Sequence, residues 1–220
     1  MPPMDNSEVN MREAVVCIHG VWMSGLDMWL LQRRLHAHGF AVYRFRYPSL
    51  TDTPAQNASR LHDFIQRLPA EVVHLVAHSL GGIVTLHLFE RHPQQPPGRV
   101  VMLGTPISGS SVALQVMQYT ALRWTLGRSV EQGLLGNVPR WQGHRELGMI
   151  AGARPIGIGT LIHRQLPRPH DGTVAVSETQ ASELNAHLIV PYSHLGMLNA
   201  PAVAHATAHF LKHGQFAAYP

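Results

Sequence analysis

The chain has little cysteine, little excess charge and no long apolar run. Cys17 is the only cysteine among 220 residues. This count excludes an intramolecular disulfide, and the apolar run 14–18 around Cys17 favours a buried, small apolar side chain. No stretch approaches the ~20 apolar residues of a membrane span. Residues 1–10 are polar and lack the apolar core of an export signal, so we expect a cytoplasmic protein without an integral membrane segment.

Charge and composition exclude several other classes of protein. Lys and Arg number 17 against 13 Asp and Glu, and no basic cluster is interleaved with aromatic residues. Nucleic-acid binding is therefore not expected. A content of 45% hydrophobic and 14% charged residues, with no internal repeat or low-complexity tract, is typical of a globular chain. We predict a single domain over residues 1–220.

Short β-branched runs alternate with longer helical patterns along most of the chain. This alternation predicts an α/β fold with a mostly parallel, six-stranded sheet flanked by helices. The expected strands are Ala14–Ile18, Ala41–Phe45, Val72–Ala77, Arg99–Leu103, Leu147–Ala151 and His187–Val190. The expected helices are Leu26–His38, Thr53–Leu68, Gly82–Arg91 and Ala200–Lys212. Asn199 is expected to cap the last helix, with Pro201 in its first turn.

The interval 106–146 interrupts this alternation. It contains an apolar helical pattern over Val112–Leu126, followed by glycine-punctuated sequence. An insertion here would lie above the carboxyl edge of the sheet, so we predict a small helical cap. Met117 and Leu122 are candidate substrate-binding residues, on an acyl-binding surface. The alternative is that such side chains simply pack onto the sheet.

Ser79 lies in Ala77-His78-Ser79-Leu80-Gly81, where a predicted strand gives way to a predicted helix. This is the pattern of a nucleophile elbow, in which a sharp turn exposes the serine Oγ and the helix N-terminus favours developing negative charge. Small residues stand two positions either side of the serine, as the close passage of strand and helix requires. The alternative is an ordinary helix-capping serine.

A base and an orienting carboxylate follow in the order that such a site needs. His194 lies in the loop after the last predicted strand, which puts it at the carboxyl edge of the sheet. Asp171, in the turn-like His170-Asp171-Gly172 sequence, is the candidate partner that fixes the imidazole tautomer. An Asp-Gly turn that caps its own backbone is the alternative. Glu178 is a fallback for the carboxylate.

Backbone donors for an oxyanion are predicted from two loops. The loop after the first strand runs from His19-Gly20 through Val21, and its glycine lets the backbone approach a ligand closely. The amides of Val21 and Leu80 are the expected donors. Trp22, Met23 and His78 are candidate pocket residues, with packing as the alternative for each.

Together these motifs, with Gly104-Thr105-Pro106 and Asp171-Gly172-Thr173-Val174, resemble the α/β-hydrolase superfamily. Within it the chain resembles small lipase-like esterases of the triacylglycerol lipase and GPI inositol-deacylase-like branch. The resemblance covers about 14–211, and Ala77 stands where glycine is commoner. It implies catalytic Ser79, Asp171 and His194, in the superfamily's chain order, with no metal and no organic cofactor.

The chemistry that these residues predict is acyl transfer to water through an acyl-serine intermediate. The expected substrate is a small-molecule or lipid-like ester with an apolar acyl group. A thioesterase or acyltransferase would use the same residues. A binding protein that kept the fold without the reaction is a third possibility.

Overall fold

One parallel sheet organises the molecule. The computed structural model describes residues 13–142, 144–163 and 165–217. The sheet has the order β2-β1-β3-β4-β5-β6, and each neighbouring pair is parallel. Its strands are β1 Glu13–Ile18, β2 Ala41–Phe45, β3 Val72–His78, β4 Val100–Leu103, β5 Leu147–Gly152 and β6 Ala186–Val190. The parallel six-stranded sheet predicted from the sequence is confirmed.

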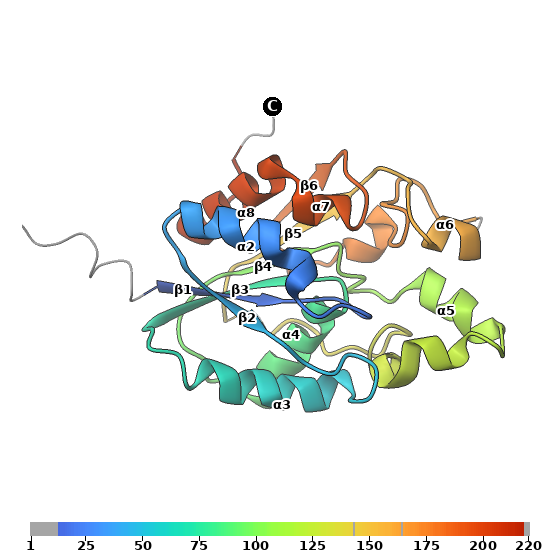
Figure 1. The fold of residues 1–220 in the computed structure, drawn as a ribbon, viewed down its shortest axis with the longest axis horizontal. Coiled ribbons are helices and arrows are strands. Elements are labelled where there is room, and N and C mark those ends of the chain that lie inside the picture. The colour runs from blue at the N-terminus through green and yellow to red at the C-terminus, as the bar shows by residue number, and fades with distance from the viewer. Residues whose placement is uncertain (1–12, 143, 164, 218–220) are drawn as a thin grey trace, which may run out of the picture.

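Helices cover both faces of the sheet (Figure 1). On one face lie α2 Trp29–Ala37 and α8 Pro201–His213, and on the other α3 Pro54–Ile65 and α4 Leu80–Arg91. Beyond one end of the sheet lie α5 Ser111–Gln118 and α6 Gly159–Ile162. The remaining elements are α7 Gly196–Asn199 and the 3-10 helices η1 Leu26–Met28, η2 Arg123–Val130 and η3 Val176–Thr179.

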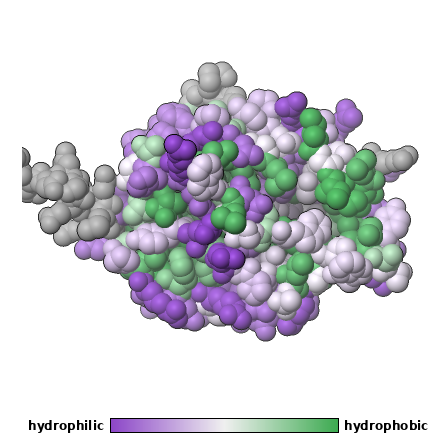
Figure 2. Space-filling model, viewed as in Figure 1, coloured by the Kyte–Doolittle hydropathy of each residue, from purple (hydrophilic) through white to green (hydrophobic). Residues whose placement is uncertain are grey.

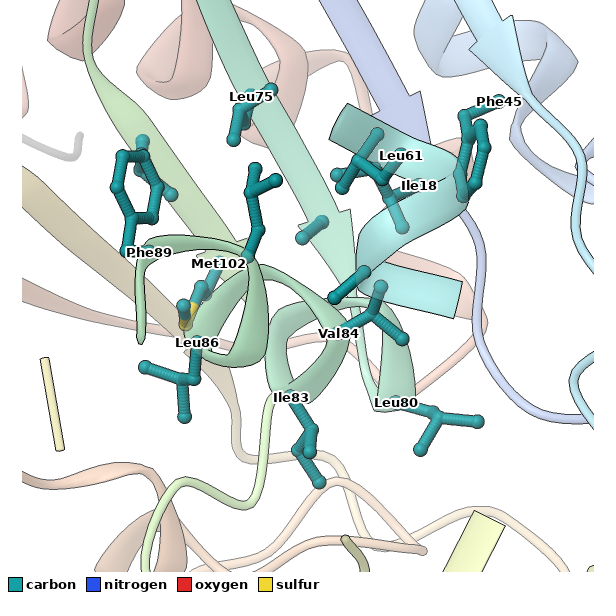
Figure 3. Packing of buried hydrophobic residues seen from close by; sticks show 14 of the residues in the cluster. Ile18, Phe45, Leu61, Leu75, Leu80, Ile83, Val84, Leu86, Phe89 and Met102 are labelled. Atoms are coloured by element: carbon teal, nitrogen blue, oxygen red, sulfur yellow. The ribbon is translucent and has the colours of Figure 1, made fainter. Parts of the chain in front are cut away.

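The core consists of two apolar layers, one on each face of the sheet. In β1, Val16 and Ile18 belong to one layer, while Val15 and Cys17 belong to the other. Burial on both faces explains why this strand is apolar throughout instead of alternating with polar residues. Figure 3 shows part of the layer that joins α3 and α4 to the sheet. Cys17 is buried as predicted, and burial raises the pKa of its thiol to about 12.

The helix predicted over Val112–Leu126 is wrong in its length. The structure has α5, which ends at Gln118, followed by the separate 3-10 segment η2. Tyr119 takes an extended conformation and turns the chain. The carbonyl of Met117, left without a helical partner there, accepts a hydrogen bond from Arg123 Nε at 2.7 Å. Apolar periodicity continues through this break, which is why the pattern reads as one helix.

The predicted cap of the last helix is also wrong. Ala200 occupies the N-cap position of α8, and Asn199 is the last residue of α7. Pro201 is the first residue of α8, and a proline forces the residue before it into an extended conformation. The residue before Pro201 is Ala200, so the helix begins one position later than an Asn199 cap requires.

No helix in the described part of the chain is long and apolar enough to cross a membrane. Residues 1–12, which include the segment predicted to lack an export signal, lie outside the described residues. Figure 2 shows apolar surface at the end of the molecule that carries α5 and α6. The exposed apolar side chains of this region include Leu114, Ile156, Ile158 and Leu161.

Candidate active site

Ser79 stands at the carboxyl end of β3, directly before α4, in a strained conformation. Its φ is 53° and its ψ is −120°, a region that residues other than glycine rarely adopt. Its side chain makes no capping hydrogen bond to α4, whereas Ser110 Oγ caps α5 by accepting from Ala113 N at 3.2 Å. The geometry is therefore that of an elbow, and the helix-capping alternative does not fit Ser79.

Gly81 lets α4 pass close to β1. A Cβ atom at this position would lie 2.5 Å from the carbonyl oxygen of Ile18 and 2.7 Å from that of His19. Real Cβ atoms do not approach backbone oxygens so closely. The requirement for a small residue here therefore comes from the packing of β1 against the turn that carries Ser79.

Asp171 and His194 form a buried pair. His194 Nδ1 lies 2.6 Å from Asp171 Oδ2, and both side chains are nearly inaccessible to solvent. A carboxylate only accepts hydrogen bonds, so Nδ1 is the donor in this pair, and in the neutral imidazole this tautomer leaves the lone pair on Nε2. The His194 backbone N–H also donates to the Asp171 carbonyl oxygen at 2.9 Å. The two loops are thus joined through backbone as well as side chain.

The second oxygen of Asp171 caps its own turn. Oδ1 accepts the backbone N–H groups of Thr173 at 2.8 Å and Val174 at 2.7 Å. The two sequence interpretations of Asp171, as a turn residue and as the partner of a histidine, therefore both apply, one to each oxygen. These bonds set the direction in which the carboxylate faces His194.

Glu178 does not take the place of Asp171. Its carboxylate accepts the backbone N–H of Ser111 at 2.7 Å and that of Ala175 at 2.9 Å. Ser111 begins α5, where backbone N–H groups have no acceptor inside the helix. Glu178 therefore fastens α5 to the loop that follows Asp171.

His78 lies between the serine turn and the histidine loop. Its ring centroid is 4.5 Å from that of His194, and its Nε2 is 3.2 Å from the His194 carbonyl oxygen. Burial is the main reason that the pKa of His78 lies well below its usual value, and the neighbouring His194 lowers this pKa further. A neutral Nε2–H therefore donates to that carbonyl and helps hold the His194 loop.

Tyr47 contacts His19 at the start of the loop after β1 and helps to hold this loop in place. The Tyr47 hydroxyl donates to the His19 carbonyl oxygen at 2.6 Å, and its ring stacks on the His19 ring at 4.2 Å. This loop presents Val21 to the same pocket as Ser79. Leu80 is the first residue of α4, so its backbone N–H has no acceptor inside the helix. Both predicted oxyanion donors thus come from segments next to Ser79.

Two hollows meet at Ser79. The larger, about 240 Å³, is also lined by His194, His78 and Met23. The smaller, about 50 Å³, lies against α5 and is lined by Val112, Ala113 and Val116 among others. Both are bordered by Val21, Trp22, Ser79, Ile158 and Thr173.

Three of the five predicted pocket residues line a hollow beside Ser79, and two do not. Trp22 borders both hollows and donates from Nε1 to the Thr125 carbonyl oxygen at 2.5 Å. Met23 and His78 line the larger hollow. Met117 and Leu122 line neither, because α5 turns other residues toward Ser79 and ends before Leu122. Sequence periodicity identified the helix but not its rotation about its own axis.

The model of the alpha/beta hydrolase family matches residues 15–212. The chain belongs to the alpha/beta hydrolase family. No curated protein matches the chain.

Solved structures of other hydrolases share the fold of this α/β hydrolase. The mature lipase BlEst2 of Bacillus licheniformis has a TM-score of 0.71 at 18% identity, covering 94% of this chain and 93% of that one. The metagenomic carboxyl esterase MGS0156 has a TM-score of 0.66 at 16% identity, covering 85% of this chain and 66% of that one. The carboxylesterase CesB of Bacillus subtilis has a TM-score of 0.57 at 14% identity, covering 93% and 85%.

Two residues shape the site of this α/β hydrolase in ways that the sequence did not predict: Tyr47 was not singled out, and Gly104 appeared only within a motif, without a role. Tyr47 follows β2 as an aromatic residue among polar ones, a signal too common to identify its role. Gly104 follows β4 with a φ of 57°, and a Cβ there would lie 3.0 Å from His194 Nδ1 and 3.1 Å from Asp171 Oδ2. Gly104 thus leaves room for the buried pair. Within the described residues, no group of three His, Cys, Asp or Glu side chains could hold a metal ion.

Proposed function

We propose that this α/β hydrolase is a serine hydrolase that cleaves carboxylic esters with an apolar acyl group. The observation that carries the proposal is a strained Ser79 that lines the same pocket as a histidine whose Nδ1 is bound to a buried carboxylate. Nucleophile, base and orienting acid are the three parts that acyl transfer requires.

In the proposed reaction, His194 Nε2 takes the proton of Ser79 as Oγ attacks the ester carbonyl. The backbone N–H groups of Val21 and Leu80 donate to the resulting oxyanion, where each donor contributes about 3 kcal/mol of transition-state stabilisation. Asp171 stabilises the imidazolium. The alcohol leaves with the proton, and a water that His194 deprotonates then hydrolyses the acyl-serine.

We also propose that segment 106–146 is a cap over the site. Support comes from α5 within this segment, which supplies apolar residues to the smaller hollow beside Ser79. Trp22 ties the loop after β1 to Thr125 in the same segment. The cap would thereby shield the acyl group from water.

Labelling with a fluorophosphonate tests the proposed function directly. The wild-type protein should be labelled stoichiometrically and should hydrolyse p-nitrophenyl esters. Ser79→Ala should lose the label and about 10⁴- to 10⁶-fold in kcat. Ser177→Ala, which changes an exposed serine of η3, is the control and should behave as wild type.

A folded wild-type protein that neither reacts with the probe nor cleaves esters would overturn the proposal and favour a binding protein. Acyl-thioesters, assayed with and without an alcohol acceptor, separate the alternatives that use the same residues. Faster turnover of thioesters than of matched oxygen esters would identify a thioesterase.

A further inference from the structure

Ser79 stands on the boundary between two compartments of different size. We call the hollow of about 50 Å³ against α5 the inner compartment, and the hollow of about 240 Å³ that His194 lines the outer compartment. Trp22, Ile158 and Thr173 border both. An ester whose carbonyl carbon lies at Ser79 therefore has one hollow on each side of that carbon for its two halves.

We propose, on the basis of the proposed esterase function, that the acyl group occupies the inner compartment and the alcohol the outer one. The substrate class is then an ester of a short apolar acid with a bulky alcohol. The assignment follows from where the proton has to go, because the leaving oxygen must receive it from the base that took it from Ser79. His194 lines the outer compartment and not the inner one.

With this placement, the proton taken from Ser79 passes through His194 to the leaving alcohol. The bond from Ser79 Oγ to the carbonyl carbon forms while the proton moves to His194 Nε2. When the bond from the carbonyl carbon to the alcohol oxygen breaks, that oxygen takes the proton. The alcohol departs through the outer compartment, and the water for the second half-reaction then enters beside His194. The acyl group stays behind in the inner compartment.

The lining of the inner compartment fits an apolar group. Its walls beyond Ser79 include the buried side chains of Val112, Ala113, Val116, Leu126, Leu134 and Val174. Ser110 also lines it, but the Ser110 hydroxyl oxygen already accepts from Ala113 N. The outer compartment differs, since Asp27 and two histidines stand among its apolar residues.

The size of the inner compartment limits the length of the acyl chain that it can hold. An apolar cavity of about 150 Å³ holds one benzene ring, which corresponds to roughly 25 Å³ for each carbon. About 50 Å³ therefore holds an acyl chain of about two or three carbons. The outer compartment, at about 240 Å³, has room for an alcohol of up to about ten heavy atoms.

Two series of esters test the assignment. With p-nitrophenol as the constant alcohol, kcat/KM should be highest for acetate to butyrate and should fall by about 10-fold or more at octanoate, since overfilling a packed site is costly. With acetate as the constant acid, kcat/KM should hold or rise from the methyl ester to the cyclohexylmethyl ester. A steady rise to octanoate, or a fall with alcohol size, would overturn the inference.

Two variants change one compartment each. Leu195→Trp adds bulk to the outer compartment at a residue that is 58% exposed. It should lower kcat/KM for the cyclohexylmethyl ester relative to the methyl ester and leave the acyl-length profile in place. Val116→Ala should raise the octanoate-to-acetate ratio of kcat/KM. Leu114→Ala, on the exposed side of the same helix, is the control and should change neither ratio.

The outcomes separate this inference from the function on which it rests. Loss of all ester cleavage and of labelling at Ser79 in the wild type would refute the proposed function itself. Ester cleavage that depends on Ser79, combined with a Leu195→Trp variant whose acyl-length profile shifts, would refute the compartment assignment alone.

Discussion

At the scale of single residues, Asp171 makes two separate interactions, one through each carboxylate oxygen. Oδ2 pairs with His194 Nδ1, while Oδ1 accepts two backbone N–H groups of its own turn. The turn therefore holds the carboxylate in the orientation that the pair requires. A change at this residue affects both the direction and the charge of the group that faces His194.

Asp171→Asn should lower kcat by about 10⁴-fold, because an amide that faces the imidazole favours the wrong tautomer. Steady-state kinetics on p-nitrophenyl butyrate would measure this loss. Asp63→Asn, at an exposed residue of α3, should keep wild-type kinetics. A kcat within a few-fold of wild type for Asp171→Asn would contradict the assigned role.

Gly104 offers a second test at this scale. Gly104→Ala places a Cβ about 3 Å from both members of the pair, so we expect kcat to fall about 10- to 100-fold as the pair is displaced. Gly136→Ala is a matched control, because Gly136 also has a positive φ but has nothing within 4 Å of its ideal Cβ position. Both variants should lose about 1 kcal/mol of stability from backbone strain.

Equal kinetics for the Gly104→Ala and Gly136→Ala variants would show that Gly104 is needed only for its positive φ, and not to leave room for the buried pair. Thermal unfolding of both variants separates the two effects, since strain lowers stability in each. Displacement of the buried pair is expected for Gly104→Ala alone.

At the scale of elements, the site depends on how α5 is fastened to its surroundings. Glu178 bonds the N-terminal Ser111 of α5 and the Ala175 N–H of the loop after Asp171. The helix that lines the inner compartment and the loop that orients His194 are thus held by one carboxylate. The sequence placed Glu178 near the site but gave no indication of this contact.

Glu178→Gln should destabilise the protein by about 1–3 kcal/mol, because one carboxylate oxygen becomes an NH₂ group facing a buried N–H donor. Urea unfolding followed by circular dichroism would measure the loss. Glu183→Gln, whose carboxylate bonds the Ser182 hydroxyl, should lose far less. Equal stabilities for the two variants would show that the fastening contributes little.

At the scale of the whole molecule, several histidines are buried in the neutral form. Burial lowers the pKa of His19, His74 and His78 below the ordinary value of 6.5. In the unfolded chain these side chains titrate near that value. Below about pH 6.5 the unfolded chain therefore binds more protons than the folded one, and stability decreases as the pH falls.

The free energy of unfolding should thus be lower at pH 5 than at pH 8, as urea titrations at both values would measure. The window from pH 6.5 to pH 5 isolates histidines, because carboxylates titrate mainly at lower pH. His78→Gln should reduce this pH dependence, because glutamine does not titrate. A free energy of unfolding that is constant or higher at pH 5 would contradict the expectation.

The order of the strands explains where the candidate site lies. The chain passes from β1 to β2 on one side and then crosses to β3 on the other, so β1 and β3 are neighbours whose connections lead in opposite directions. Such a switch point opens a crevice at the carboxyl edge of a parallel sheet. The loop with Val21 follows β1, and Ser79 follows β3. Local patterns predicted each strand, but strand order depends on which strands pair.

The sequence by itself determined the features that depend on neighbouring residues. The six strands follow from short apolar runs between turn residues, and the bend at Ser79 follows from small residues at fixed spacing. The Asp-Gly turn at Asp171 likewise needs only its own four residues. These features have local causes, so a single sequence carries them.

Only the tertiary structure decided the rest. It determined which side of α5 faces Ser79, so that Val112 and Val116 line the inner compartment while Met117 does not. It brought Tyr47 beneath the loop after β1 and Gly104 against the buried pair. These contacts join residues far apart in the chain, and their geometry depends on how helices and loops pack on the sheet, which no local pattern specifies.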